Sequence, residues 1–223
     1  VVRDFVALTQ KLGFSPILLP FQPNGKAMHI KGFLARFSKT AKTQAEFLNR
    51  VAKFNVPLVG VDSAIVLSYR DEYKEALGDS RGDFHVLTAH EWLTNQLESN
   101  ALQSAVKNIA KSDRTFEWHL FPHCTESTFM PNSPKEWQHI FAQFGQTLNV
   151  EKVGCCGMAG VFGHEVQNQT MSKDIYDISW GKKLQGKDPN HCLATGYSCR
   201  SQVKRYEKAI LKHPVQALLE ILN

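Results

Sequence analysis

The sequence predicts an α/β fold made of two pseudo-symmetric repeats, each with short parallel strands and flanking helices. The first observation is that short, wholly apolar runs, such as the one over 57–61, alternate with longer segments whose apolar residues recur every three or four positions. Strands that alternate with helices in this way are typical of parallel sheets. The second observation is that segments of the first half can be laid over segments of the second half, which indicates an internal repeat.

The first half begins with the end of a helix and continues with two buried strands. Phe5, Leu8 and Leu12 share one helical face, and Gly13 ends that helix. The second strand stops at Asp62. In chain order we predict a helix over 1–14, a strand over 16–19, a turn over 23–26, a helix over 43–54 and a strand over 57–61.

The second half repeats the alternation of strands and helices. Its clearest helix start is Ser133-Pro134-Lys135-Glu136, which combines an N-cap serine, a proline at the first helical position and a capping-box glutamate. The predicted strands cover 83–88, 115–121, 150–153 and 192–195. The predicted helices cover 89–110, 133–148, 166–183, a basic segment from Cys199 to 212, and 215–222.

The internal repeat sets the predicted domain boundary. The segment 23–27 can be laid over 155–159, and 59–63 over 194–199 with a shift of one residue. Every cysteine falls in the second copy. We therefore predict two domains, a degenerate first repeat without cysteines and truncated at its start over 1–82, and a second repeat with the cysteine site over 83–223.

Length, composition and charge restrict the class of protein. With 223 residues, of which 43% are hydrophobic and 21% charged, the chain can form a globular core. No apolar run reaches the ~20 residues of a membrane-spanning helix, and no signal-peptide pattern opens the chain. The net charge of +5 is modest, and we expect no nucleic-acid partner.

The basic stretch over 200–212 is typical of a solvated helix face, with an acidic partner or a membrane surface as the alternative. Because the first residue is Val1, we expect a fragment of a longer polypeptide.

The cysteines carry the chemical prediction. Cys155 and Cys156 are adjacent in a segment whose glycines recur every three positions, and such a segment can fold tightly around a small group. Cysteine-bearing loops at Cys124, at this pair and at 192–199 each follow a predicted strand, and the carboxyl ends of parallel strands converge. Thiolates gathered there repel each other unless a cation holds them, so zinc or an iron–sulfur cluster is expected. Thiol–disulfide exchange is the alternative.

The cysteine pattern also resembles a known family. The single Cys124, the turn Cys155-Cys156-Gly157 and the segment 195–202 resemble the cysteine-rich CCG domain found in the B subunit of heterodisulfide reductase and in glycolate oxidase iron–sulfur subunits. The segment 196–222 resembles the C-terminus of large bacterial FAD-linked oxidoreductases, which are similar to D-lactate and D-2-hydroxyglutarate dehydrogenases. Those proteins join a flavin domain, a ferredoxin-like domain and a CCG domain in one polypeptide.

The resemblance implies a set of ligands for the metal group. Cys124, Cys155, Cys156 and Cys199 fall on the cluster-ligand positions of the family, and Gly157 is the glycine of the turn. No residue of this chain is expected to be catalytic.

The sequence departs from the family pattern at one position. The family often ends its motif with Cys-x-x-Cys, and Gly196 stands where the first of these cysteines is expected. Cys192, four residues earlier, is the candidate replacement ligand. His123 and His164 flank the cysteine loops, and we interpret them as surface or supporting residues, with metal ligation or proton transfer as the alternative.

The function that the resemblance implies is electron transfer. We expect an iron–sulfur module, of the 4Fe-4S type, that relays electrons from a flavin to an acceptor such as a quinone. Its parent would be an FAD-linked 2-hydroxy-acid dehydrogenase whose flavin and substrate sites lie in other domains. The alternatives are a structural zinc-binding docking domain and a thiol–disulfide redox module. The expected location is the cytoplasm, and peripheral attachment to the inner face of the membrane is the alternative.

Overall fold

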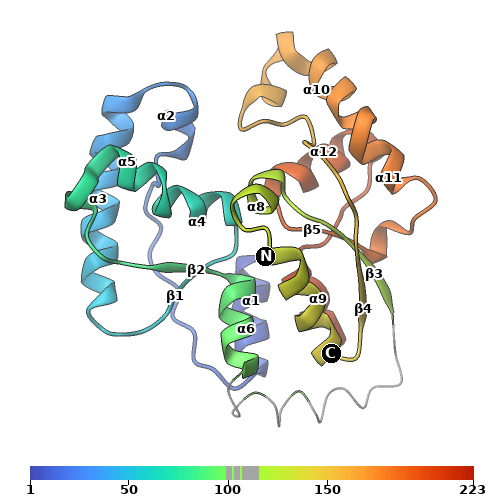
Figure 1. The fold of residues 1–223 in the computed structure, drawn as a ribbon, viewed down its shortest axis with the longest axis horizontal. Coiled ribbons are helices and arrows are strands. Elements are labelled where there is room, and N and C mark those ends of the chain that lie inside the picture. Colours follow the sequence, from blue (N-terminus) through green and yellow to red (C-terminus); the bar gives the residue numbers. More distant parts are fainter. Residues whose placement is uncertain (99–101, 103–105, 107–115) are drawn as a thin grey trace. The chain divides into compact units, whose positions relative to one another are not determined.

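The computed structural model describes residues 1–98, 102, 106 and 116–223. These residues divide into two compact units. The small unit comprises Leu18–Ala89, and the cysteine unit comprises Val1–Ile17 together with His90–Asn223. Both contain short parallel strands with flanking helices, so the predicted α/β class is confirmed (Figure 1). The relation of the two units as copies of one repeat stays a prediction.

The small unit is built on a two-stranded parallel sheet. Strand β1 (Leu58–Gly60) pairs with β2 (Val86–Thr88), and Leu58 lies opposite Val86. Helix α4 begins directly after β1 because the Asp62 carboxylate accepts a hydrogen bond from the amide of Ile65, which caps the helix. The helical elements of this unit are α2 (Lys26–Ile30), α3 (Leu34–Ala52), α4 (Ser63–Arg70), α5 (Glu72–Leu77) and the 3-10 turn η1 (Gly78–Arg81).

The core of the small unit is apolar and aromatic. Phe37 on α3 packs edge-on against Tyr73 of α5, and both are buried. The Tyr73 hydroxyl donates a hydrogen bond to the carbonyl of Asn24 at 2.7 Å, so the loop before α2 is tied to this core. The buried polar tip is thereby paired, as burial of a tyrosine requires.

The cysteine unit is built on a three-stranded parallel sheet in the order β4-β3-β5. Its strands are β3 (Glu117–Phe121), β4 (Thr147–Val150) and β5 (Cys192–Ala194). Leu120 of β3 lies opposite Val150 of β4, and Phe121 lies opposite Ala194 of β5. The three carboxyl ends are therefore level with one another, because β3 is the common neighbour of the other two strands.

Helices flank this sheet and extend beyond it. Helix α9 packs against β4 (Figure 1), and α1 packs against α13. The helices are α1 (Val2–Lys11), α6 (Ala89–Glu98), α8 (Cys124–Phe129), α9 (Ser133–Gln143), α10 (Gln169–Tyr176), α11 (Lys182–Leu184), α12 (Tyr197–Glu207) and α13 (Pro214–Ile221). Short turns η2 (Phe162–His164), η3 (Val166–Asn168) and η5 (Pro189–His191) are 3-10 helices, and η4 (Asp177–Gly181) is a π-helix.

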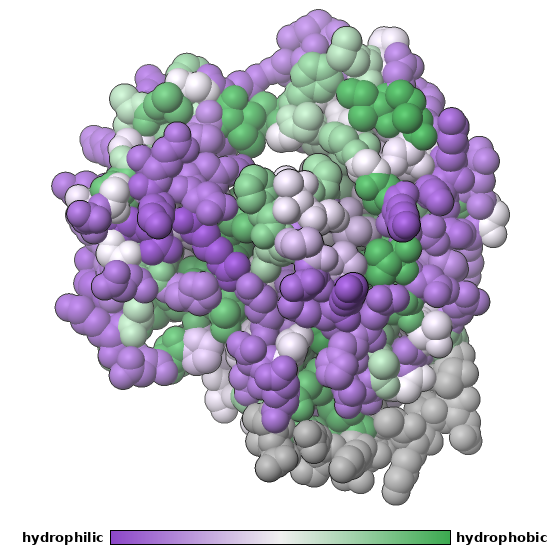
Figure 2. All heavy atoms as spheres, in the orientation of Figure 1, coloured by the Kyte–Doolittle hydropathy of each residue, from purple (hydrophilic) through white to green (hydrophobic). Residues whose placement is uncertain are grey.

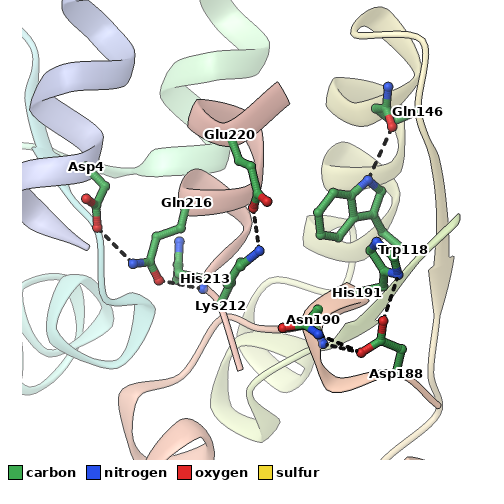
Figure 3. A network of polar contacts seen from close by, with 10 residues as sticks. All are labelled: Asp4, Trp118, Gln146, Asp188, Asn190, His191, Lys212, His213, Gln216 and Glu220. Carbon is green, nitrogen blue, oxygen red and sulfur yellow. Dashed lines mark hydrogen bonds and ion pairs between the residues drawn. The ribbon is translucent and has the colours of Figure 1, made fainter. Parts of the chain in front are cut away.

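A buried histidine caps helix α13 and orders the end of the chain. The Nδ1 atom of His213 accepts a hydrogen bond from the amide of Val215, and the amide of His213 donates to the side chain of Gln216. This reciprocal pair is a capping box formed by histidine and glutamine. Gln216 also donates to Asp4 at 2.8 Å, which connects α13 to α1 (Figure 3).

The predicted strand over 16–19 is wrong. These residues form neither strand nor helix, and Ile17 and Leu18 are 83% and 68% exposed. The physical reason lies at both ends of the run: Pro16 and Pro20 have no N–H to donate to a sheet. An apolar run of this kind is therefore compatible with an extended surface segment.

Other boundaries differ from the predictions for local reasons. Ser133 was predicted as the N-cap of α9, but it is the first residue of this helix and the N-cap is Asn132; the Ser133 hydroxyl donates to the buried carboxylate of Glu126. The next strand starts at Thr147 rather than 150, because α9 ends early and Gly145 turns the chain with φ +69°. Helix α12 ends at Glu207 rather than 212. Part of the predicted helix over 89–110 lies outside the described residues.

The described part of the chain has no helix that is both long and apolar enough to cross a membrane. On the face drawn in Figure 2, hydrophilic side chains alternate with smaller areas of hydrophobic ones.

Candidate functional site

The candidate site lies at the carboxyl ends of the three parallel strands of the cysteine unit. Strand β3 leads through Pro122 and His123 into α8, which begins at Cys124. Strand β4 leads into the loop that carries Cys155 and Cys156, and β5 leads into α12, which carries Cys199. The strands end side by side, so the predicted convergence of the three loops is confirmed.

Four thiols at these strand ends form one connected group, which we call the thiol group: Cys124, Cys155, Cys156 and Cys199. The four thiols influence one another electrostatically: Cys155 interacts with Cys124 and Cys156, and Cys156 interacts with Cys199. All four are free thiols. Cys124 and Cys155 are partly exposed, whereas Cys156 and Cys199 are buried. The structure therefore brings together the four predicted ligand positions, while ligation itself stays a prediction.

Negative charge in the thiol group concentrates on Cys155. Hydrogen bonds from the thiols of Cys124 and Cys156 lower the pKa of Cys155 far below the ordinary thiol range, and the amides of Gly157 and Ala159 add to this effect. The Gly157 amide lies 3.3 Å from the sulfur. The hydrogen bond to Cys155, followed by burial, raises the pKa of Cys124. These opposite shifts favour a thiolate at Cys155, beside protonated thiols and the backbone amides of Gly157 and Ala159.

The turn after the cysteine pair requires glycine. Gly157 has φ +82°, and Gly160 has φ +69°. A Cβ atom at Gly157 would overlap the carbonyl oxygen of Ser172 on α10 and would lie 3.3 Å from Nε2 of Gln202. The absence of a side chain therefore allows the amide of Gly157 to face Cys155 while helix α10 approaches from the other side.

Two buried polar side chains hold the cysteine turn from the helices behind it. Gln202 of α12 donates from Nε2 to the carbonyl of Cys156 at 3.0 Å and to the hydroxyl of Ser172 at 2.8 Å. Ser172 donates in turn to the carbonyl of Gly157 at 2.7 Å. Both side chains are completely buried. We call Gln202 and Ser172 the polar clamp.

Further contacts fix the chain on the other side of the pair. The indole of Trp180 donates to the carbonyl of Gly154 at 3.0 Å, and the hydroxyl of Ser179 accepts from the amide of Gly154 at 2.7 Å. The backbone before and after the two cysteines is thus held by four side chains, from α10, η4 and α12. Sequence reasoning did not identify them. The one available indication was Gln202, a polar residue three positions after Cys199 and therefore on the same face of a helix.

Cys192 lies outside the thiol group, because no other thiol contributes to its pKa shift. It is completely buried in β5, where it lies opposite His119. Burial raises its pKa to about 11, and its charged neighbours are Lys187, Asp188 and Glu151 rather than other thiols. Its predicted role as a replacement ligand is untested, but its surroundings are those of a core cysteine.

The two flanking histidines have different environments. His164 is exposed, and its Nδ1 lies 3.3 Å from the guanidinium of Arg205. His123 is only 8% exposed, and its amide donates to the hydroxyl of Thr195 at 2.9 Å. A Cβ atom at Gly196 would overlap the imidazole of His123 and would lie 3.0 Å from the sulfur of Cys199.

Several residues of the basic stretch are engaged within the cysteine unit. Arg200 donates to the carbonyls of Ala194 and Thr195, and Arg205 donates to the carbonyl of Gly163. Lys212 pairs with Glu220. These contacts tie part of the stretch to the cysteine unit, whereas the prediction was a solvated helix face.

The sulfur donors of the thiol group are of the kind that binds a thiophilic metal group, but their arrangement is not that of a metal site. Across residues 1–98, 102, 106 and 116–223, no group of three or more His, Cys, Asp or Glu side chains is arranged to hold one metal ion. The four sulfurs nevertheless interact electrostatically, and the amide of Gly157, which donates to the Cys155 sulfur, suits a negatively charged group. We therefore regard the residues as fitting such a group in the kind of donor they supply, and metal binding would require the thiols to lose their protons.

The fold and the site together define a parallel α/β module with a thiol group at its strand ends. No family model matches the chain. Over all 223 residues the chain is 80% identical to the D-2-hydroxyglutarate dehydrogenase of Haemophilus influenzae and 57% identical to that of Escherichia coli, and it spans 22% and 21% of those proteins. It is also 21% identical, over 99% of its length, to the C subunit of the anaerobic glycerol-3-phosphate dehydrogenase of Escherichia coli, of which it spans 54%. The chain thus corresponds to about a fifth of the D-2-hydroxyglutarate dehydrogenases that it matches.

Proposed function

We propose that this chain is the cysteine-rich electron-transfer module of an FAD-linked dehydrogenase that oxidises D-2-hydroxyglutarate or a related 2-hydroxy acid. The observation that carries the proposal is the connected group of four thiols, which come from three loops that the parallel sheet aligns. The similarity to proteins named as dehydrogenases supports the same assignment.

In this proposal the thiol group holds an iron–sulfur cluster, which supplies one-electron storage when it is bound. Cys124, Cys155, Cys156 and Cys199 provide the thiolates, with Cys155 already ionised before the cluster arrives. The amides of Gly157 and Ala159 orient toward the negative charge, and the polar clamp keeps the backbone of the pair in place. Burial of Cys156 and Cys199 excludes water from one side.

The partners in this proposal are other parts of a longer polypeptide. A flavin domain would deliver electrons, a ferredoxin-like domain would carry them, and an acceptor such as a quinone would receive them. The small unit would be a degenerate copy of the cysteine unit. Its segment 23–27, the counterpart of the cysteine turn, is held by the hydroxyl of Tyr73 rather than organised around thiols.

Metal and sulfide analysis tests the proposal most directly. The chain is purified without oxygen, reconstituted with iron and sulfide, and assayed for both elements together with its visible absorption. Cys155→Ser is expected to lose most of the bound iron. Cys192→Ala is the matched control, because Cys192 is buried in the same core but lies outside the thiol group, and it should retain the cluster. Zinc that survives reductant, without iron, would favour a structural zinc site instead.

A thiol–disulfide module is the second candidate, and the interaction of Cys124 with Cys155, which shifts their pKa values in opposite directions, favours it. A thiolate with a thiol in contact is one oxidation step from a disulfide. If the metal-free protein forms a reversible Cys124–Cys155 disulfide while iron and zinc both fail to bind, the electron-transfer proposal is wrong and this one stands.

A further inference from the structure

We propose that helix α3 of the small unit and the turn before it form a surface that binds anionic lipid bilayers. The surface has two parts, which we call the basic face and the apolar turn. The basic face lies on the first half of α3 and consists of Arg36, Lys39 and Lys42. The apolar turn joins α2 to α3 and consists of Ile30, Phe33 and Leu34. This inference goes beyond the proposed function and does not rest on it, because the small unit contains none of the thiols.

The two sides of α3 differ in chemistry. One side is buried, and its residues recur every three or four positions: Phe37, Ala41, Gln44, Ala45 and Leu48. The three cations of the basic face fall on the opposite side of the helix, and all three are exposed. Glu46, one turn beyond Lys42, is the one acidic side chain in the sequence of α3. The exposed side of the helix therefore carries a net positive charge.

The basic face is not neutralised within the part of the chain that the structure describes. None of its cations has a carboxylate partner among residues 1–98, 102, 106 and 116–223. Arg36, Lys39 and Lys42 follow one another at intervals of three, so they are neighbours on the helix surface and their charges repel each other. They span about 9 Å along the helix axis, within one screening length at physiological salt. An anionic partner would relieve this repulsion.

The apolar turn presents large side chains at the amino end of the same helix. Ile30, Phe33 and Leu34 are 39%, 56% and 59% exposed. At Gly32, no atom of the described chain lies within 4 Å of the position of a Cβ, so the turn is open to its surroundings. Backbone hydrogen bonds from Gly32 and Phe33 to α2 fix its conformation. The guanidinium carbon of Arg36 lies 5.7 Å from the centroid of the Phe33 ring, so the two parts of the surface are in contact.

The composition of this surface favours a bilayer over an acidic protein. The centre of a protein–protein interface is depleted of lysine, whereas cations beside exposed apolar side chains are typical of segments that lie on anionic membranes. Lipid head groups also supply negative charge without a fixed arrangement, so they can meet all three cations at once. Phe33 and Leu34 would enter the boundary between head groups and acyl chains, while the long basic side chains remain at the phosphates.

Vesicle flotation of the metal-free 223-residue chain tests the basic face. The chain should float with vesicles of phosphatidylcholine and phosphatidylglycerol but not with phosphatidylcholine alone, and added salt should weaken the binding. Arg36→Glu/Lys39→Glu should reduce partition onto the anionic vesicles by at least about tenfold. The matched control is Lys182→Glu/Lys183→Glu, which makes the same change of charge at exposed positions of α11 in the cysteine unit and should retain binding.

A second set of variants tests the apolar turn. Leu34→Ser should weaken the binding severalfold, whereas Ile178→Ser, at a residue of η4 that is 70% exposed, should not. Phe33→Trp adds a fluorophore to the turn, and vesicles with brominated acyl chains should quench its emission beyond the quenching seen with the wild-type chain. The residues replaced in these variants are all exposed, so the variants should remain folded, and circular dichroism checks this.

Three results would overturn the inference. If the wild-type chain does not float with the anionic vesicles, the basic face does not bind lipid, and an acidic protein becomes the partner to test. If the two charge variants bind equally, net charge rather than this surface governs the binding. If Phe33→Trp binds without additional quenching, the turn does not enter the bilayer. None of these results bears on the proposed function, which is tested by the iron and sulfide that the cysteine unit binds.

Discussion

Replacement of Gly157 by alanine is the sharpest test of how the cysteine turn is built. The backbone at Gly157 has φ +82°, and alanine in a left-handed conformation costs about 1–2 kcal/mol. The new Cβ would also overlap the carbonyl oxygen of Ser172, which belongs to helix backbone and cannot rotate away. Overpacking of this kind costs about 1–3 kcal/mol, so Gly157→Ala should lower the free energy of unfolding by about 2–5 kcal/mol in total.

Gly186→Ala separates the two contributions. Gly186 has φ +76°, similar to that of Gly157, but no atom of the described chain lies within 4 Å of the position of its Cβ. This variant should therefore show the conformational cost alone, about 1–2 kcal/mol. Urea unfolding followed by tryptophan fluorescence is the assay, because all four tryptophans lie in the cysteine unit. Equal losses in the two variants would refute the reasoning, since the overlap with Ser172 would then cost nothing.

Three further predictions concern the same unit. Gln202→Leu should reduce the free energy of unfolding by about 1–3 kcal/mol, measured in the same assay, because the buried carbonyl of Cys156 loses its donor; unchanged stability would show that the clamp is dispensable. In the metal-free chain at about pH 7, iodoacetamide should alkylate Cys155 well before Cys124, although both are partly exposed, because their pKa values are shifted in opposite directions. Peptide mass spectrometry reads this order, and equal rates would contradict it. Burial, followed by the charge of Arg200, holds the pKa of His213 in the folded chain well below its ordinary value. As the pH falls, the unfolded chain therefore takes up a proton at His213 before the folded chain does. Stability should therefore be flat above about pH 6.5 and fall below it, and His213→Asn, which keeps a capping side chain without a titrating ring, should flatten that fall.

The fold class and the gathering of the thiols could be predicted because both follow from local patterns. Apolar runs between helical segments indicate parallel strands, and parallel strands place the residues that follow them at one edge. The same logic failed for the run over 16–19, where prolines at both ends remove sheet donors. It also misplaced the cap of α9, because Ser133 is engaged by Glu126, a partner on another helix that no local pattern reveals.

The side chains that hold the cysteine turn could not be predicted, because packing between elements that are distant in the sequence brings them to it. Ser172, Trp180 and Gln202 reach the cysteine turn only because α10, η4 and α12 pack behind it. None of these side chains belongs to a motif with a chemical role of its own. The position of His123 against Gly196 likewise depends on how two strand ends align, which becomes visible only once the sheet is formed.

The unequal exposure of the four sulfurs has a consequence for how the site is loaded. In the proposed function a metal ion would first meet the partly exposed Cys124 and Cys155, where the lowered pKa of Cys155 favours a thiolate. Bonds to the buried Cys156 and Cys199 would each release a proton. Acidification would therefore oppose the bonds to the buried sulfurs more than the first contact with Cys155.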